Sequence, residues 1–148
     1  MQLTFTVDGK PPKKDGGQSL WSEKSKQSPL VFKLRSEATK SMKQAGIEGP
    51  FQANLKLVLK VFSPFITHKD QHNHVGDLDT LVAGVFEAIQ PAPQNETLHP
   101  NPIFETNSDT NPKIPIITEN DSQIVEVEAQ KIKSNETYYT VTIEEIIE

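Results

Sequence analysis

The sequence predicts an α+β domain, with a mixed β-sheet and two main helices packed on one side. Alternating apolar residues predict strands near both ends of the chain and at its centre. Two other segments repeat apolar residues every three or four positions, which is typical of helices. Several short alternating segments follow the second helix with no further helix between them, which favours an α+β fold.

The first half contains a strand, a helix and a second strand. Residues 2–7 alternate polar and apolar side chains, and the turn chemistry of residues 8–12 ends this strand. Ser28 is a candidate N-cap with Pro29 after it, and the helix runs to Gly46, a typical C-terminal cap. Residues 51–62 give the strongest strand pattern in the chain, with one wholly apolar face.

The second half begins with a helix over residues 76–90 and a long irregular loop at about 91–115, rich in proline and asparagine. A short strand is predicted at 114–118, followed by a turn at 119–122. Residues 123–133 then alternate, with Val125, Val127 and Ala129 opposite Glu126 and Glu128. Residues 134–136 predict a hairpin turn, and residues 137–147 a last strand.

Length and composition favour a single domain over residues 1–148. The absence of cysteine excludes disulfides, thiolate metal sites and cysteine nucleophiles. No run of 18 apolar residues occurs, and the first residues lack a signal-peptide pattern, so we expect a soluble, cytoplasmic protein that does not enter membranes.

Charge is divided unevenly along the chain. Residues 1–70 hold 12 lysines and arginines against 6 acidic residues, a net charge of +6, and residues 71–148 hold 3 against 14, a net of −11. This asymmetry predicts a basic face and an acidic region, although a chance segregation of solvated charges explains it equally well. Clustered carboxylates would repel nucleic acid, or hold divalent ions that bridge to phosphate.

Three aspartates are the candidate metal ligands. Asp77 and Asp79 stand at the start of the second helix, where the helix dipole favours carboxylates. Asp121 lies in a turn between two strands. Three carboxylates from two elements suit Mg²⁺ or Mn²⁺, which prefer oxygen ligands. The alternative is structural, with Asp77 as an N-cap and Asp121 as a turn former.

These motifs and their order resemble the RusA family of Holliday-junction resolvases, which cut four-way DNA junctions with divalent metal. The matching segments are Gly9-Lys10-Pro11, Gly76-Asp77-Leu78-Asp79-Thr80-Leu81 and Glu119-Asn120-Asp121-Ser122-Gln123-Ile124. The resemblance extends from Gln2 to about Glu144. It implies a RusA-like fold and a metal-dependent, structure-selective endodeoxyribonuclease of DNA recombination and repair.

Three positions depart from the family pattern. Thr80 stands where the family has asparagine, Asn120 where it has aspartate, and Ala83 where it has the catalytic lysine. A cation that would stabilise the phosphate transition state is therefore missing from its usual position, and Lys69, Lys131 and Lys133 are possible substitutes.

The resemblance also implies roles for other residues. Ions held by Asp77, Asp79 and Asp121 would activate water for attack on a backbone phosphorus. The cations expected to contact the DNA backbone are Lys10, Lys13, Lys14, Lys33, Arg35, Lys40, Lys43 and Lys69. His68, His72 and His74 could serve as a base, contact phosphate or bind a transition metal, but solvated histidines are the simpler interpretation. Family members are dimers, so a homodimer on branched DNA is expected.

Two other functions compete with the nuclease. The first is a branched-DNA-binding protein of the same fold that has lost catalysis, which Ala83 favours. The second is a protein-interaction module that uses the 91–115 loop and binds no DNA. DNA affinity that falls with salt separates the two DNA functions from the interaction module.

Overall fold

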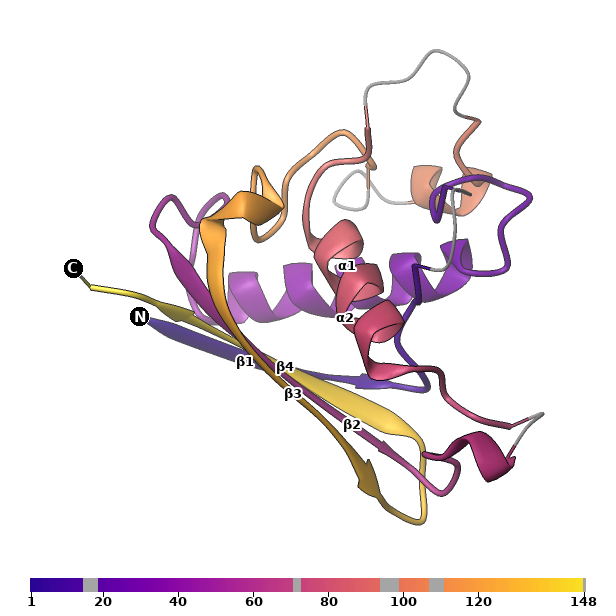
Figure 1. The fold of residues 1–148 in the computed structure, drawn as a ribbon. Helices are drawn as coiled ribbons and strands as arrows, with labels where there is room; N and C mark the ends of the chain where they lie inside the picture. Colours follow the sequence, from indigo (N-terminus) through magenta and orange to yellow (C-terminus); the bar gives the residue numbers. More distant parts are fainter. Residues whose placement is uncertain (15–18, 71–72, 94–98, 107–110, 148) are drawn as a thin grey trace.

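The fold is a four-stranded mixed sheet with two helices on one face, as the sequence predicts (Figure 1). The computed structural model describes residues 1–14, 19–70, 73–93, 99–106 and 111–147. Its strands are β1 (Gln2–Asp8), β2 (Leu55–Ser63), β3 (Ile124–Lys133) and β4 (Tyr138–Glu145). The main helices are α1 (Ser28–Gln44) and α2 (Leu78–Ile89), and the short helices are η1 (His68–Asp70), η2 (Pro102–Glu105) and η4 (Asp121–Gln123).

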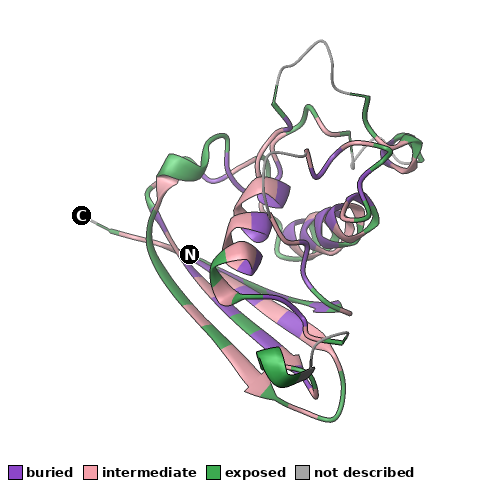
Figure 2. Cartoon of the chain, turned by 45° about the vertical axis from the view of Figure 1, so that its right-hand side comes forward, coloured by how far each residue is buried: buried purple, intermediate pink, exposed green. Residues whose placement is uncertain are grey.

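The core lies between the sheet and the helices. Every second residue of β1, β2 and β4 is buried on this side, as the alternation requires (Figure 2). Leu34 and Leu81 bring the apolar stripes of the two helices into the same core. Burial of this apolar surface holds the two layers together.

The sheet order is β1-β4-β2-β3, so β4 is inserted between β1 and β2. β4 is antiparallel to both neighbours, whereas β3 is parallel to β2. The predicted hairpin at residues 134–136 is therefore wrong, because its two strands flank β2 and do not pair with each other. The turn crosses the end of β2, where the Ser134 N–H donates to the Ser63 carbonyl.

Helix α1 ends as predicted but begins differently. Gly46 has a φ of 71°, and the Ile47 N–H donates to the Met42 carbonyl, which completes a glycine C-cap. At the other end the N-cap is Gln27, not Ser28. The Ser28 hydroxyl is buried and donates to the Ser25 carbonyl, so this side chain stabilises the preceding turn.

One predicted strand changes its bounds, and the strand predicted at residues 114–118 is wrong. Strand β2 begins at Leu55, four residues later than residues 51–62 suggested. The 114–118 segment is not a strand, because the N–H groups of Ile117 and Thr118 donate to the Ile89 carbonyl at the end of α2. Ile116 and Ile117 are buried by packing at a helix end, whereas Ile114 is exposed, and Pro115 could not have donated to a ladder.

The 91–115 loop is partly built into the fold. Within its described residues, Pro102–Glu105 form η2, and Phe104 is buried against Trp21 with ring centroids 5.4 Å apart. The loop therefore contributes to the core through an aromatic anchor. Among the described residues, no helix combines the length and apolar character needed to cross a bilayer.

Candidate metal and nucleic-acid site

The start of α2 holds two exposed carboxylates on a well-anchored turn. Asp77 is the N-cap residue, but its side chain makes no capping hydrogen bond, and Asp79 lies in the first turn. Thr80 fixes the turn through a hydroxyl that donates to the Asp77 carbonyl and an N–H that donates to Asp79 Oδ1, both at 2.9 Å. Asp77 therefore occupies the N-cap position that a purely structural role predicts, but its carboxylate does not cap the helix.

Gly76 lets the chain enter the helix at this point. Its φ of 126° is one that residues with side chains rarely adopt. A Cβ here would also lie 3.2 Å from Leu81 and 3.6 Å from the Lys13 side chain. The glycine therefore gives the turn that directs Asp77 and brings the Lys13 stem beside it.

Lys131 reaches the same turn from the sheet. Its Nζ donates to the Gly76 carbonyl at 3.1 Å and lies 3.0 Å from His74 Nε2. This places an ammonium group one residue before Asp77. The sequence pattern of β3 could have predicted this contact. Lys131 lies on the same face of the strand as Val127 and Ala129, and this face points toward the helices.

Residues 13 and 14 add further cations beside α2. The Lys14 N–H donates to the Thr80 carbonyl at 2.9 Å, and Lys14 Nζ pairs with Glu87 at 3.4 Å. This close approach requires Gly84, because a Cβ there would overlap the Pro12 carbonyl. Lys13 and Lys14 are thus positioned along α2 by backbone contacts and not by charge alone.

The other predicted DNA contacts divide into three groups. Lys10 and Lys33 are exposed near the end of β1, where Lys33 Nζ lies 3.9 Å from Asp8 Oδ2. Lys40 and Lys43 are exposed in the last turns of α1, and Lys69 is exposed in η1.

His68 is the first residue of η1, and His74 follows this short helix. His68 is exposed, His74 contacts Lys131, and His72 lies outside the described residues.

Arg35 is not on the surface, so its predicted role in DNA binding is wrong. Its side chain is fully buried and donates to four backbone carbonyls, those of Ala88, Gln90, Asn111 and Ile114. The guanidinium also lies over the Trp21 ring, 4.9 Å from its centroid. Burial lowers the pKa of Arg35 from 12.5 to about 9, which still leaves it charged at neutral pH.

Asp121 lies at the opposite end of α2 from Asp77 and Asp79. Its N–H donates to the Gln90 side chain at 3.0 Å, and Gln90 is the C-cap of α2. A helix of 12 residues is about 18 Å long, so one chain does not bring the three predicted ligands together. Among the residues that the structure describes, no three histidine, aspartate or glutamate side chains form a metal-binding group.

The turn around Asp121 has a structural role of its own. Asn120 caps η4 by accepting from the Ser122 N–H, and the Gln123 side chain accepts from the Asn120 N–H. Gln123 also donates to the Phe51 carbonyl. This capping box explains Asn120 and Gln123 without a metal and leaves the Asp121 carboxylate exposed.

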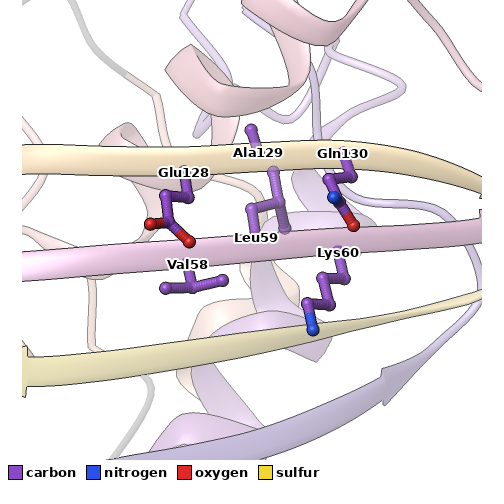
Figure 3. A pocket seen from close by; sticks show the side chains of 6 residues that line it. All are labelled: Val58, Leu59, Lys60, Glu128, Ala129 and Gln130. Carbon is purple, nitrogen blue, oxygen red and sulfur yellow. The ribbon is translucent and has the colours of Figure 1, made fainter.

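A hollow of about 400 Å³ lies along β2 and β3 (Figure 3). Its lining residues are Val58, Leu59, Lys60, Glu128, Ala129 and Gln130. None of the predicted metal or DNA contacts is among them. Cations and carboxylates gather instead at the start of α2.

No family model matches this chain, and no curated protein matches it. The functional assignment therefore depends on the motifs and on the geometry described above.

Proposed function

We propose that the chain is a metal-dependent, structure-selective endodeoxyribonuclease that binds and cuts four-way DNA junctions. The observation that carries the proposal is the contact of Lys131 with the Gly76 carbonyl, directly before Asp77. It supplies a cation beside two carboxylates and a helix N-terminus, although Ala83 replaces the family lysine.

The donor set fits a hard ion with few protein ligands. Asp77 and Asp79 provide carboxylate oxygens from one turn. Mg²⁺ commonly binds through one or two carboxylates, retains waters and uses substrate phosphate as a further ligand. When bound, Mg²⁺ or Mn²⁺ would lower the pKa of a water and offset charge on the leaving oxygen.

The protein's own groups would then orient the phosphodiester. Lys131 donates to the Gly76 carbonyl, lies beside His74 Nε2, and places its charge at the turn that bears Asp77. The charge on a phosphoryl oxygen grows in the transition state, and a fixed ammonium group stabilises it there. Lys13 and Lys14 lie along the same helix and would hold the neighbouring backbone phosphates by charge.

A cleavage assay tests this proposal. Purified protein is mixed with a labelled four-way junction or a matched duplex, in Mg²⁺, Mn²⁺ or EDTA. We expect paired, metal-dependent nicks in the junction, lost in Asp79→Asn. Glu48→Gln is the matched control, because it removes an exposed carboxylate from the loop after α1.

Lys131→Ala tests the substitute cation. We expect a fall of ~10²–10³-fold in the cleavage rate with a much smaller change in junction affinity, because the ammonium acts in the transition state. Lys60→Ala, an exposed lysine on β2, should leave both quantities unchanged. An equal fall in cleavage rate in Lys131→Ala and Lys60→Ala would contradict a role for Lys131 at the site.

A second function is favoured by one observation, the separation of Asp121 from Asp77 and Asp79. A chain with an incomplete ligand set would bind branched DNA without cutting it. Junction binding without nicks in either metal supports this function. Absence of binding at low salt would contradict both DNA functions and leave the protein-interaction module.

A further inference from the structure

The two edges of the sheet differ in how far they are covered. Strand β1 alternates strictly between exposed and buried residues, because α1 packs against it. Strand β3, at the other edge, has four consecutive exposed residues at 125–128. Val125 is 56% exposed and Val127 45%, although Leu57, the register partner of Val127, is fully buried. β3 is therefore an edge strand whose apolar residues are left uncovered.

The backbone of β3 is suited to a further strand. Its pairing with β2 is regular from Glu126 to Lys133, after a shift in register at its start. On its outer side β3 pairs with no strand in the described part of the chain, so its outward N–H and C=O groups have no ladder partner there. Such an edge is a template for an extended peptide, which gains affinity from main-chain hydrogen bonds and specificity from alternate side chains.

The two faces of this edge carry different chemistry. Glu126 and Glu128 lie on the face of the sheet away from the helices, as register partners of Lys56 and Val58. Val127 lies on the opposite face, toward the helices. A strand added beside β3 would therefore contact carboxylates with one set of alternate side chains and an apolar residue with the other.

Negative charge is in excess at this corner of the uncovered face. Lys56 Nζ donates to Glu128 Oε1 at 2.9 Å. This hydrogen bond, together with the charges of Glu126 and Glu144, raises the pKa of Lys56. Three carboxylates thus surround one ammonium group, and the side chain of Glu128 is still 61% exposed. A basic strand would offset this excess, whereas a second copy of β3 would bring up the same carboxylates.

The hollow along β2 and β3 lies beside these carboxylates (Figure 3). Val58 gives it an apolar lining, and Lys60, Glu128 and Gln130 give it a polar lining. A lysine or arginine opposite Glu128 would lay its aliphatic stem toward Val58 and keep its charge beside the carboxylate. The hollow therefore favours a long basic side chain at this position of an added strand.

Lys131 limits the length of the added strand. On the helix side its Nζ contacts the Gly76 carbonyl and His74, so this side of β3 is covered beyond Gln130. The uncovered stretch at residues 125–130 matches a strand of about six residues, a common length in globular proteins.

We propose that β3 binds an extended peptide segment of another protein, in which lysine or arginine alternates with apolar residues, as a fifth strand of the sheet. Its basic side chains lie on the uncovered face against Glu126 and Glu128, and its apolar side chains cover Val127. This interface does not depend on the proposed nuclease, because Lys131 and Asp77 lie on the helix side of the sheet.

Fluorescence anisotropy tests the partner with a labelled peptide in which lysine and valine alternate over about six residues. A peptide of the same composition, with its lysines and valines in two blocks, controls for charge alone. We expect the alternating peptide to bind at least about tenfold more weakly to Glu126→Lys/Glu128→Lys, because two attractive contacts become repulsive. Glu23→Lys/Glu105→Lys is the charge-matched control, which changes exposed carboxylates before α1 and in η2, and should leave the affinity unchanged.

A charge exchange protects the test against a folding defect. A peptide that alternates glutamate and valine should bind Glu126→Lys/Glu128→Lys more tightly than it binds the wild type. Hydrogen exchange on the wild type locates the ladder, because the lysine–valine peptide at saturation should slow exchange in β3 and leave β1, the other edge, unchanged.

Four results would overturn the interface. They are no binding of the alternating lysine–valine peptide, equal binding of the alternating and block peptides, loss of the reciprocal charge preference, and protection of β1 in place of β3. Protection of β3 in the chain alone that rises with protein concentration would show that a second copy occupies the edge, and would also overturn the peptide as its partner.

Discussion

Arg35 is a buried cation whose guanidinium donates hydrogen bonds to backbone carbonyls. Its four acceptors belong to the end of α2 and to residues 111–114, so one side chain joins two segments to α1. Such a group is costly to bury, and its removal leaves the carbonyls without donors. It stabilises the fold by position and not by attraction to DNA.

Replacement of Arg35 by methionine should lower the free energy of unfolding by about 3 kcal/mol or more, because several buried carbonyls would lose their donors. Urea denaturation measures this change. Lys33→Met is the control, an exposed lysine on the same helix, and should change stability by less than about 0.5 kcal/mol. Equal effects of the two substitutions would mean that the carbonyl contacts contribute little.

Tyr139 carries a buried hydroxyl that has no hydrogen-bond partner in the part of the chain that the structure describes. Burial raises the pKa of Tyr139 well above its usual value of 10.0, with a smaller contribution from Glu37. The native state then holds this proton more tightly than the unfolded chain. Stability from this group is therefore complete below pH 10 and is lost as the pH rises above it.

Tyr139→Phe should be neutral or stabilising by about 1 kcal/mol at pH 7, because it removes a buried polar group that lacks a partner. Its advantage over the wild type should widen above pH 10, since the variant has no phenol to ionise at this position. Urea denaturation at pH 7 and pH 10.5 measures both effects. Tyr138→Phe, on the uncovered face beside Phe62, is the matched control.

At the scale of elements, α2 depends on one glycine for its contact with residues 10–14. Alanine normally favours a helix over glycine by about 1 kcal/mol. At Gly84 the added Cβ would overlap the Pro12 carbonyl and approach Lys13 Cα at 2.8 Å. Steric overlap with backbone therefore outweighs helix propensity.

Gly84→Ala should lower stability by about 1–3 kcal/mol and should also weaken junction binding, because the segment that bears Lys13 and Lys14 must move away. Thermal unfolding and a binding titration give the two results. Ala83→Gly, the neighbouring position, should cost about 1 kcal/mol through propensity alone and leave binding unchanged. A stabilised Gly84→Ala variant would show that this contact is loose.

Periodicity predicted the main elements because it depends on burial along one strand or helix. The apolar faces of β1, β2, β4 and both helices are buried as expected. This pattern does not determine which strands pair with one another. The alternation on either side of residues 134–136 therefore suggested a hairpin, although β2 lies between the two strands.

The candidate site was predictable only where its residues are close in sequence. Asp77 and Asp79 occupy the expected turn, but the placement of Asp121 depends on the path of the chain around α2. Arg35 looked like its exposed neighbours because helical spacing alone does not separate a buried cation from a surface one. Its position one residue after Leu34, at the edge of the apolar stripe, was the available signal.

At the scale of the whole molecule, the basic residues of the N-terminal half are not equivalent. Lys10 lies near the end of β1 and Lys13 near the start of α2, whereas Lys40 and Lys43 lie at the far end of α1, about 10–15 Å further along that helix than Lys33. The excess positive charge of residues 1–70 is therefore divided among more than one region of the surface.

The double variant Lys10→Gln/Lys13→Gln should reduce the dependence of junction affinity on salt by about 1.8 in the slope of log K against log salt, because two phosphate contacts are lost. Titrations between 50 and 200 mM salt, about the range over which such contacts act, measure it. Lys40→Gln/Lys43→Gln is the charge-matched comparison and should change the slope less. Equal slopes would mean that DNA follows α1 instead.

The insertion of β4 between β1 and β2 has a consequence for synthesis of the chain. β1 is synthesised well before β4, its sheet partner, because residues 9–137 lie between the two strands. Before β4 is synthesised, β1 has no hydrogen-bonded partner among the described strands, and β2 can pair only with β3. β4 is therefore the last of the described strands to join the sheet, and a chaperone that protects β1 until β4 has been synthesised should improve the yield of folded protein.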